Sequence, residues 1–205
     1  KGGPALLTPK RISQSSALIV DDEIVMIDAG YGASLRLAEA GQSLKHLRSI
    51  FITHLHGDHI AGWPFLLLRM VYRDGRIRPL KISGPPGTRE TFESLARLCY
   101  SDSSLWEKIA FEIIYEELPV EERSGIDCGG LLVDTFPLAH HPTSLGLVFD
   151  SGGTRIGISG DTGWCPALER LVAASDTLII ECTTVERAGA KHLSLEELRS
   201  HSGLF

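Results

Sequence analysis

The sequence has no hydrophobic run long enough to cross a bilayer and no excess of basic residues. Its longest mostly apolar stretch, residues 63–72, is interrupted by Arg69 and is too short for a membrane span. Asp and Glu number 26 against 20 Lys and Arg, so the formal net charge is −6. The basic residues form no run, and the chain lacks the electrostatic footprint of a nucleic-acid-binding domain. We therefore expect no membrane partner and no broad nucleic-acid surface.

Cysteines are few as well. The four of them form neither a CxxC pair nor the framework of a small disulfide-stapled domain. We expect reduced thiols and a cytoplasmic protein. The sequence begins with Lys1 rather than Met, so we expect the natural chain to begin earlier.

The composition is that of an ordinary globular protein, with 43% apolar and 22% charged residues in a chain of 205. This length, without repeats or linkers, predicts a single domain over residues 1–205. Groups of predicted strands have helices between them but no strict alternation. That order favours an α/β (α+β) fold in which sheets are covered by outer helices.

The expected elements follow from apolar periodicity and turn residues. We predict a hairpin over residues 17–28 and a loop over residues 121–127. Helices are expected over residues 33–40, 58–71, 88–100, 166–174 and 194–201. Further strands are expected over residues 49–53, 80–83, 109–118, 131–136, 145–150, 154–159 and 177–180.

The most informative stretch is THLHGDH at residues 53–59, directly after the apolar run at residues 50–52. His54 and His56 are two apart, so in extended backbone they project from the same side. Gly57 permits a sharp turn and Asp58 suits a helix start. Together with His59, these side chains would surround one point. Neutral imidazoles and carboxylates ligate zinc and related ions, so the stretch predicts a metal site.

Other segments carry further candidate residues. They are IDAG at residues 27–30, PLAHHPTSLG at 137–146, SGDT at 159–162, IIECT at 179–183 and KHLSLE at 191–196. With HLHGDH they make the sequence resemble the metallo-β-lactamase superfamily, whose signature is HxHxDH. The last two segments resemble the ribonuclease Z and phosphodiesterase-like branch. The resemblance covers nearly the whole chain and implies a four-layer αβ/βα sandwich.

The resemblance also implies a metal-ligand set for two divalent ions. His54, His56 and His140 would hold the first metal, Asp58 and His59 the second, and Asp161 would bridge both. His141 is the alternative to His140, which fits the family spacing better. Zinc is the expected metal, with manganese or iron as alternatives. Such a pair lowers the pKa of a shared water so that hydroxide forms near neutral pH, and Asp58 would orient that water or take its proton.

By the same resemblance, His192 is a candidate general acid and Glu181 the residue that orients it. An ordinary position before a helix cap is the alternative for His192. The long arm that bacterial ribonuclease Z inserts before the SGDT segment is absent, because residues 145–159 pass directly between the two strands. A small or short phosphodiester is therefore preferred over tRNA as the substrate. The family's last metal ligand, a His, is expected beyond Phe205.

The sequence thus predicts a dinuclear metal-dependent hydrolase, foremost a phosphodiesterase using a metal-bound hydroxide. The alternatives are a lactonase or thioester hydrolase on the same centre, a mononuclear-iron sulfur dioxygenase, and a metal-binding protein without turnover. A homodimer is expected from the resemblance alone.

Overall fold

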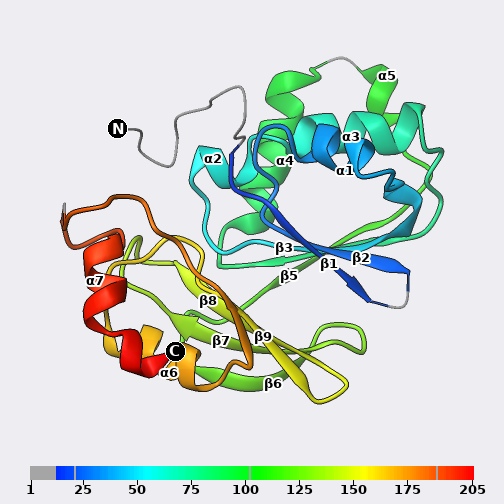
Figure 1. Cartoon of the computed structure of the whole chain (residues 1–205). Helices are drawn as coiled ribbons and strands as arrows, with labels where there is room; N and C mark the ends of the chain where they lie inside the picture. Colours follow the sequence, from blue (N-terminus) through cyan, green and yellow to red (C-terminus); the bar gives the residue numbers. More distant parts are fainter. Residues whose placement is uncertain (1–12, 21, 102, 188) are drawn as a thin grey trace. The chain divides into compact units, whose positions relative to one another are not determined.

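The computed structural model describes residues 13–20, 22–101, 103–187 and 189–205 (Figure 1). These residues fall into two compact units. We call residues 13–117 the N-terminal unit and residues 118–205 the C-terminal unit. The single domain expected over residues 1–205 stays a prediction.

The N-terminal unit is a five-stranded sheet in the order β1-β2-β3-β4-β5. Strands β1 and β2 form an antiparallel hairpin, and the other neighbours are parallel. The strands are β1 (Ser16–Val20), β2 (Glu23–Ile27), β3 (Leu47–Phe51), β4 (Leu80–Gly84) and β5 (Ile113–Glu117). The helical elements are α1 (Ala33–Glu39), η1 (Leu44–His46), α2 (Gly57–Ile60), α3 (Trp63–Tyr72), α4 (Thr88–Cys99) and α5 (Ser103–Trp106).

One hydrophobic core joins this sheet to its helices, several of which gather over it in Figure 1. Strand β2 is a nearly continuous apolar run, as is usual for buried parallel strands, and β3 is buried except at Arg48, which is partly exposed. Met26 and Ile50 are fully buried together with Leu66 of α3 and Phe92 of α4. The indole Nε1 of Trp63 donates to the Phe92 carbonyl at 3.1 Å. This core anchors the C-terminal ends of β2 and β3, which residues 28–30 and 53–59 follow.

The C-terminal unit contains a second five-stranded sheet, in the order β10-β9-β8-β7-β6. Its strands are β6 (Arg123–Asp127), β7 (Leu132–Pro137), β8 (Leu145–Ser151), β9 (Thr154–Ile158) and β10 (Thr177–Ile179). Its helical elements are α6 (Pro166–Ala173), α7 (Leu195–Ser200) and η2 (Ser202–Leu204). Only the β9–β10 pair is parallel. A hydrophobic core lies between the sheet and α6, and it includes Phe136, Val148, Leu168 and Leu171.

Most predicted elements are confirmed, including the opening hairpin and the direct β8–β9 hairpin in place of an arm. The single helix predicted over residues 58–71 is wrong, because α2 ends at Ile60 and α3 begins at Trp63. A Cβ on Gly62 would collide with the carbonyl oxygens of Ala29 and Gly30. Glycine is therefore needed there, and its N–H donates to the Ala29 carbonyl at 2.8 Å instead of continuing the helix.

The loop predicted over residues 121–127 is also wrong, because this segment contains edge strand β6. Gly125 has a φ of 70° and lies where the β6–β7 register shifts. Its N–H donates to Asp134 Oδ1 at 2.7 Å. The exposed, glycine-containing sequence concealed a bulged strand at the sheet edge.

Helix α5 was not predicted, and the strand predicted over residues 109–118 is shorter than expected, covering Ile113–Glu117. No helix among the described residues combines the length and apolar character needed to cross a membrane.

Candidate metal centre

In the N-terminal unit, the histidine-rich stretch forms the turn from β3 into α2. The ring centroids of His54 and His56 are 4.7 Å apart, and those of His54 and His59 are 4.0 Å apart. Asp58 Oδ2 lies 3.9 Å from His59 Nε2. His54 and His59 are buried, whereas His56 is exposed. The turn therefore groups three imidazoles and one carboxylate, which is a donor set suited to a divalent metal ion.

Asp28 holds this turn from the end of β2. It is buried and adopts a φ of 59°, a left-handed conformation that Asp tolerates better than most residues. Its Oδ1 accepts a hydrogen bond from the backbone N–H of Thr53 at 2.9 Å. Its Oδ2 lies 2.7 Å from Nδ1 of His59. Because a carboxylate only accepts hydrogen bonds when ionised, His59 carries its proton on Nδ1, and its buried Nε2 is the unprotonated nitrogen.

The Thr53 hydroxyl sets the tautomer of His54 in the same way. It lies 2.9 Å from Asp28 Oδ2 and 3.2 Å from Nδ1 of His54. Its single proton is donated to the carboxylate, so it accepts from the N–H of His54. Assigned from these partners, the tautomer of His54 also leaves Nε2 available for a metal. One carboxylate thus sets the protonation of two candidate ligands.

A close backbone contact fixes α2 against the same segment. The N–H of Ala29 donates to the His59 carbonyl at 2.6 Å, and the N–H of Gly62 donates to the Ala29 carbonyl at 2.8 Å. A Cβ on Gly30 would collide with the carbonyl oxygen of Asp58. Glycine at this position therefore lets the chain lie directly against the ligand-bearing turn.

In the C-terminal unit, His140, Asp161 and His192 place their potential ligand atoms within 4.8 Å of one another. They come from the β7–β8 connection, the turn after β9 and the segment before α7. Nδ1 of His140 lies 2.9 Å from the Lys191 carbonyl oxygen, to which it donates, so that Nε2 is left for a metal. The unit therefore gathers its own metal-type donor set from three distant segments.

His141, the alternative to His140, lies elsewhere. It is exposed, and its Nδ1 is 3.1 Å from the Thr143 hydroxyl. Its N–H donates to Ser144 Oγ at 3.0 Å, which makes it part of the turn between β7 and β8. This geometry supports the choice of His140.

Glu181 is held rigidly next to His192. Its Oε1 accepts from the Thr162 N–H at 2.5 Å and lies 3.2 Å from Nδ1 of His192. Its Oε2 accepts from the Thr183 hydroxyl at 2.7 Å. Burial raises the pKa of the Glu181 carboxyl above its ordinary value, while the hydrogen bonds from Thr183 and Thr162 act in the opposite direction. An ionised Glu181 accepts the Nδ1–H of His192 and thereby orients the ring.

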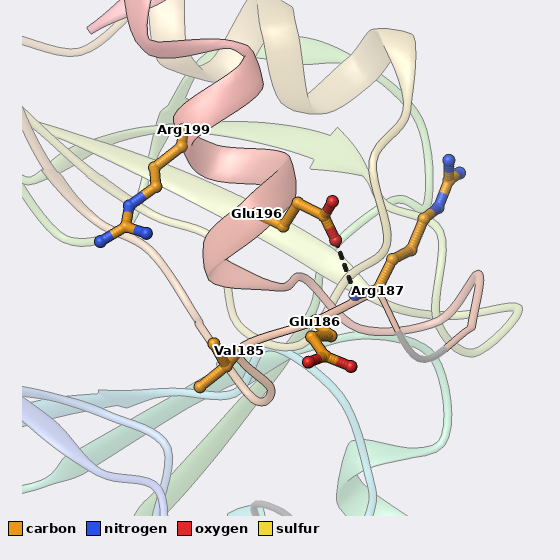
Figure 2. A pocket seen from close by; sticks show the side chains of 5 residues that line it. All are labelled: Val185, Glu186, Arg187, Glu196 and Arg199. Atoms are coloured by element: carbon orange, nitrogen blue, oxygen red, sulfur yellow. Dashed lines mark hydrogen bonds between the residues drawn. The ribbon is translucent and has the colours of Figure 1, made fainter.

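A surface pocket of about 550 Å³ lies beside the start of α7 (Figure 2). It is lined by Val185, Glu186, Arg187, Glu196 and Arg199. Figure 2 shows the two arginine side chains extending away from each other, with Glu196 between them. The backbone N–H of Arg187 donates to Glu196 Oε2 at 3.3 Å. None of the predicted metal ligands lines this pocket.

Sequence reasoning missed three features of the site. The family segment at residues 27–30 contains Asp28 but assigns it no role, and the sequence marks Thr53 only as the end of a strand. The carbonyl of Lys191 carries no sequence signal at all. Their partners lie 25 to 51 residues away in the chain, so local patterns could not reveal them.

The family model described as Anti-Pycsar protein Apyc1 matches residues 3–203. The ribonuclease Z of Mycobacterium sp. (strain KMS) is 30% identical over 183 residues, which cover 83% of this chain and 62% of that protein. Human tRNase Z, short form, superposes with a TM-score of 0.79 at 26% identity, covering 98% of this chain and 85% of that one.

The metallo-β-lactamase fold protein YhfI from Bacillus subtilis superposes with a TM-score of 0.73 at 18% identity, covering 94% and 74% of the two chains. The predicted metallo-β-lactamase fold is confirmed. The chain spans less than two thirds of the length of the curated ribonuclease Z relatives that it matches.

Proposed function

Because this chain belongs to the Anti-Pycsar protein Apyc1 family, within the ribonuclease Z-like branch of the metallo-β-lactamase superfamily, we propose that it is a metal-dependent phosphodiesterase. One observation carries the proposal. His140 and Asp161 lie beside His192, whose Nδ1 is held by the buried Glu181. A structural metal site needs ligands alone, whereas this site adds an oriented imidazole that can transfer a proton.

The donors fit divalent ions, since each unit offers imidazole nitrogens with fixed tautomers together with carboxylates. The proposed assignment is a dinuclear one with Zn²⁺ as the first choice and manganese or iron as alternatives. In this assignment His54, His56 and His140 would hold the first ion, Asp58 and His59 the second, and Asp161 would contribute to both. When bound, such ions supply an acidified water and positive charge for the phosphoryl oxygens.

The protein's own residues supply positioning and proton transfer. Asp28 and Thr53 keep the Nε2 atoms of His54 and His59 unprotonated. Asp58 orients the attacking water or accepts its proton. His192, held through Nδ1 by Glu181, donates a proton from Nε2 to the departing oxygen.

The substrate class we propose is a small or short phosphodiester rather than tRNA. Strands β8 and β9 pair directly, with Ser151 opposite Thr154, so no arm extends between them. The net charge of −6 also disfavours a long polyanion. A homodimer in the cytoplasm completes the proposal. None of the four cysteines, all of which the structure describes, forms a disulfide, as expected in a reducing compartment.

Metal analysis combined with a substrate panel tests this function. Purified protein should contain divalent metal and hydrolyse bis(p-nitrophenyl) phosphate in preference to lactone and thioester substrates. His56→Ala should lose both metal and most of the turnover. Metal-free protein from a metal-supplemented preparation, or full activity in His56→Ala, would contradict the proposal.

The acid role of His192 needs a separate comparison. His192→Ala should lose more activity on a diester with a poorly activated leaving group than on one with an activated leaving group, because only the former requires protonation. Equal losses on both substrates would argue against a general acid.

A further inference from the structure

The segment that carries His192 is a loop whose two ends are tied together. The N–H of Thr183 donates to the Leu193 carbonyl at 3.0 Å, and the N–H of Leu195 donates to the Thr184 carbonyl at 2.9 Å. Thr184 and Ser194 also form an isolated parallel bridge. We call residues 184–194 the acid loop. Backbone hydrogen bonds fix the base of this loop, so residues 191–193 lie at a defined place in the unit.

Two contacts then hold Lys191, near the end of this loop, beside the ligand cluster. The carbonyl oxygen of Ala190 packs so closely on Gly163 that a Cβ there would collide with it. The carbonyl oxygen of Lys191 itself accepts the N–H of His140 at 2.9 Å. The Lys191 backbone is therefore positioned by Gly163, directly after the SGDT segment, on one side and by a candidate metal ligand on the other.

The ionisable side chains around Lys191 include two carboxylates. Asp161 and Glu181 contribute two carboxylates next to His140 and His192. Lys191 is exposed, and it forms no ion pair within the part of the chain that the structure describes. Its ammonium group has three donors on a flexible stem, which suits the oxygens of a phosphate.

We propose that Lys191 binds a non-bridging oxygen of the substrate's phosphate group and thereby selects anionic phosphodiesters. The inference deepens the proposed function and rests on it. Because His140 needs only the Lys191 backbone carbonyl, the side chain is free for this second task. Lys191 is thus a binding residue whose removal should leave the metal ligands in place.

The test uses Lys191→Gln, which removes the charge and keeps the carbonyl, together with Lys191→Arg, which keeps both. Turnover of bis(p-nitrophenyl) phosphate gives kcat and KM, and calorimetric titration with inorganic phosphate gives binding without turnover. In Lys191→Gln, KM and the phosphate Kd should both rise about five- to tenfold, as expected for loss of one charge-assisted contact. The value of kcat should stay within about twofold of wild type, because a uniform binding interaction is lost. Lys191→Arg should stay close to wild type.

Arg199→Gln is the matched control, since it removes another exposed cation from the same unit. It should leave KM and phosphate binding unchanged, and metal content should be equal in all variants. High salt should reduce the difference between wild type and Lys191→Gln, because a partly exposed charge is screened.

Wild-type KM and Kd in Lys191→Gln would overturn the inference. So would an equal change in Arg199→Gln, or loss of metal in Lys191→Gln. Wild-type protein that binds phosphate but hydrolyses no diester would contradict the proposed function instead. In that case the phosphate titration of the Lys191 variants still decides whether Lys191 binds the anion.

Discussion

Replacing Asp28 by Asn should weaken metal binding without removing a single metal ligand. Asn has nearly the same size and also tolerates the φ of 59° at this position. The carboxylate accepts from the Thr53 N–H, the Thr53 hydroxyl and the His59 Nδ1–H at 2.9, 2.9 and 2.7 Å. An amide has only one oxygen, so its NH₂ group must face at least one of these donors.

The expected losses of stability and of metal affinity follow from the number of donors that the amide cannot satisfy. One buried donor left without an acceptor costs about 1–3 kcal/mol of unfolding free energy. If the NH₂ group faces His59, it donates to Nδ1 and shifts the ring proton to Nε2, which is the atom needed for the metal. Loss of such an orienting partner typically lowers metal affinity about 10–100-fold.

The assay pairs urea unfolding of metal-free protein with competition for metal against a chromophoric chelator. Asp134→Asn is the matched control, because Asp134 is a buried carboxylate that accepts from Arg155 and from the Gly125 N–H. It should lower stability and leave metal affinity unchanged. The reasoning is refuted if Asp28→Asn and Asp134→Asn destabilise the protein alike and bind metal as tightly as wild type.

Three further substitutions address other parts of the molecule. Gly163→Ala should push the Ala190 carbonyl, and with it the acid loop, away from residue 163, lowering both Tm and kcat in parallel thermal and kinetic measurements. Arg76→Lys should cost about 2–3 kcal/mol in urea unfolding, because the buried guanidinium donates to three backbone carbonyls that an ammonium cannot reach together. Thr183→Val should move the acidic limb of the pH–rate profile to higher pH. In the wild-type protein the hydrogen bond from the Thr183 hydroxyl lowers the pKa of Glu181. Without this hydroxyl the pKa of Glu181 rises further, so the orienting carboxylate forms only at higher pH.

Much of the fold was predictable because local apolar patterns indicate its helices and strands. The apolar run of β2 and the capping box of Ser194 and Glu197 at α7 are examples. The wrong prediction of one helix over residues 58–71 shows a limit of such local patterns. Its apolar residues continue across Gly62, but the N–H of Gly62 donates to the Ala29 carbonyl instead of to a carbonyl of α2. Tertiary contact outweighs local periodicity at that point.

The candidate ligands could be found from sequence because metal chemistry needs particular side chains, but the nitrogen that each histidine offers could not. That choice depends on partners such as Asp28 for His59, the Lys191 carbonyl for His140 and Glu181 for His192, which are 31, 51 and 11 residues away. In each case an oxygen accepts the Nδ1 proton, and Nε2 remains to bind a metal or transfer a proton. Activity should therefore be sensitive to residues that never touch the substrate, and substitutions of these oxygen acceptors should mimic partial loss of a ligand.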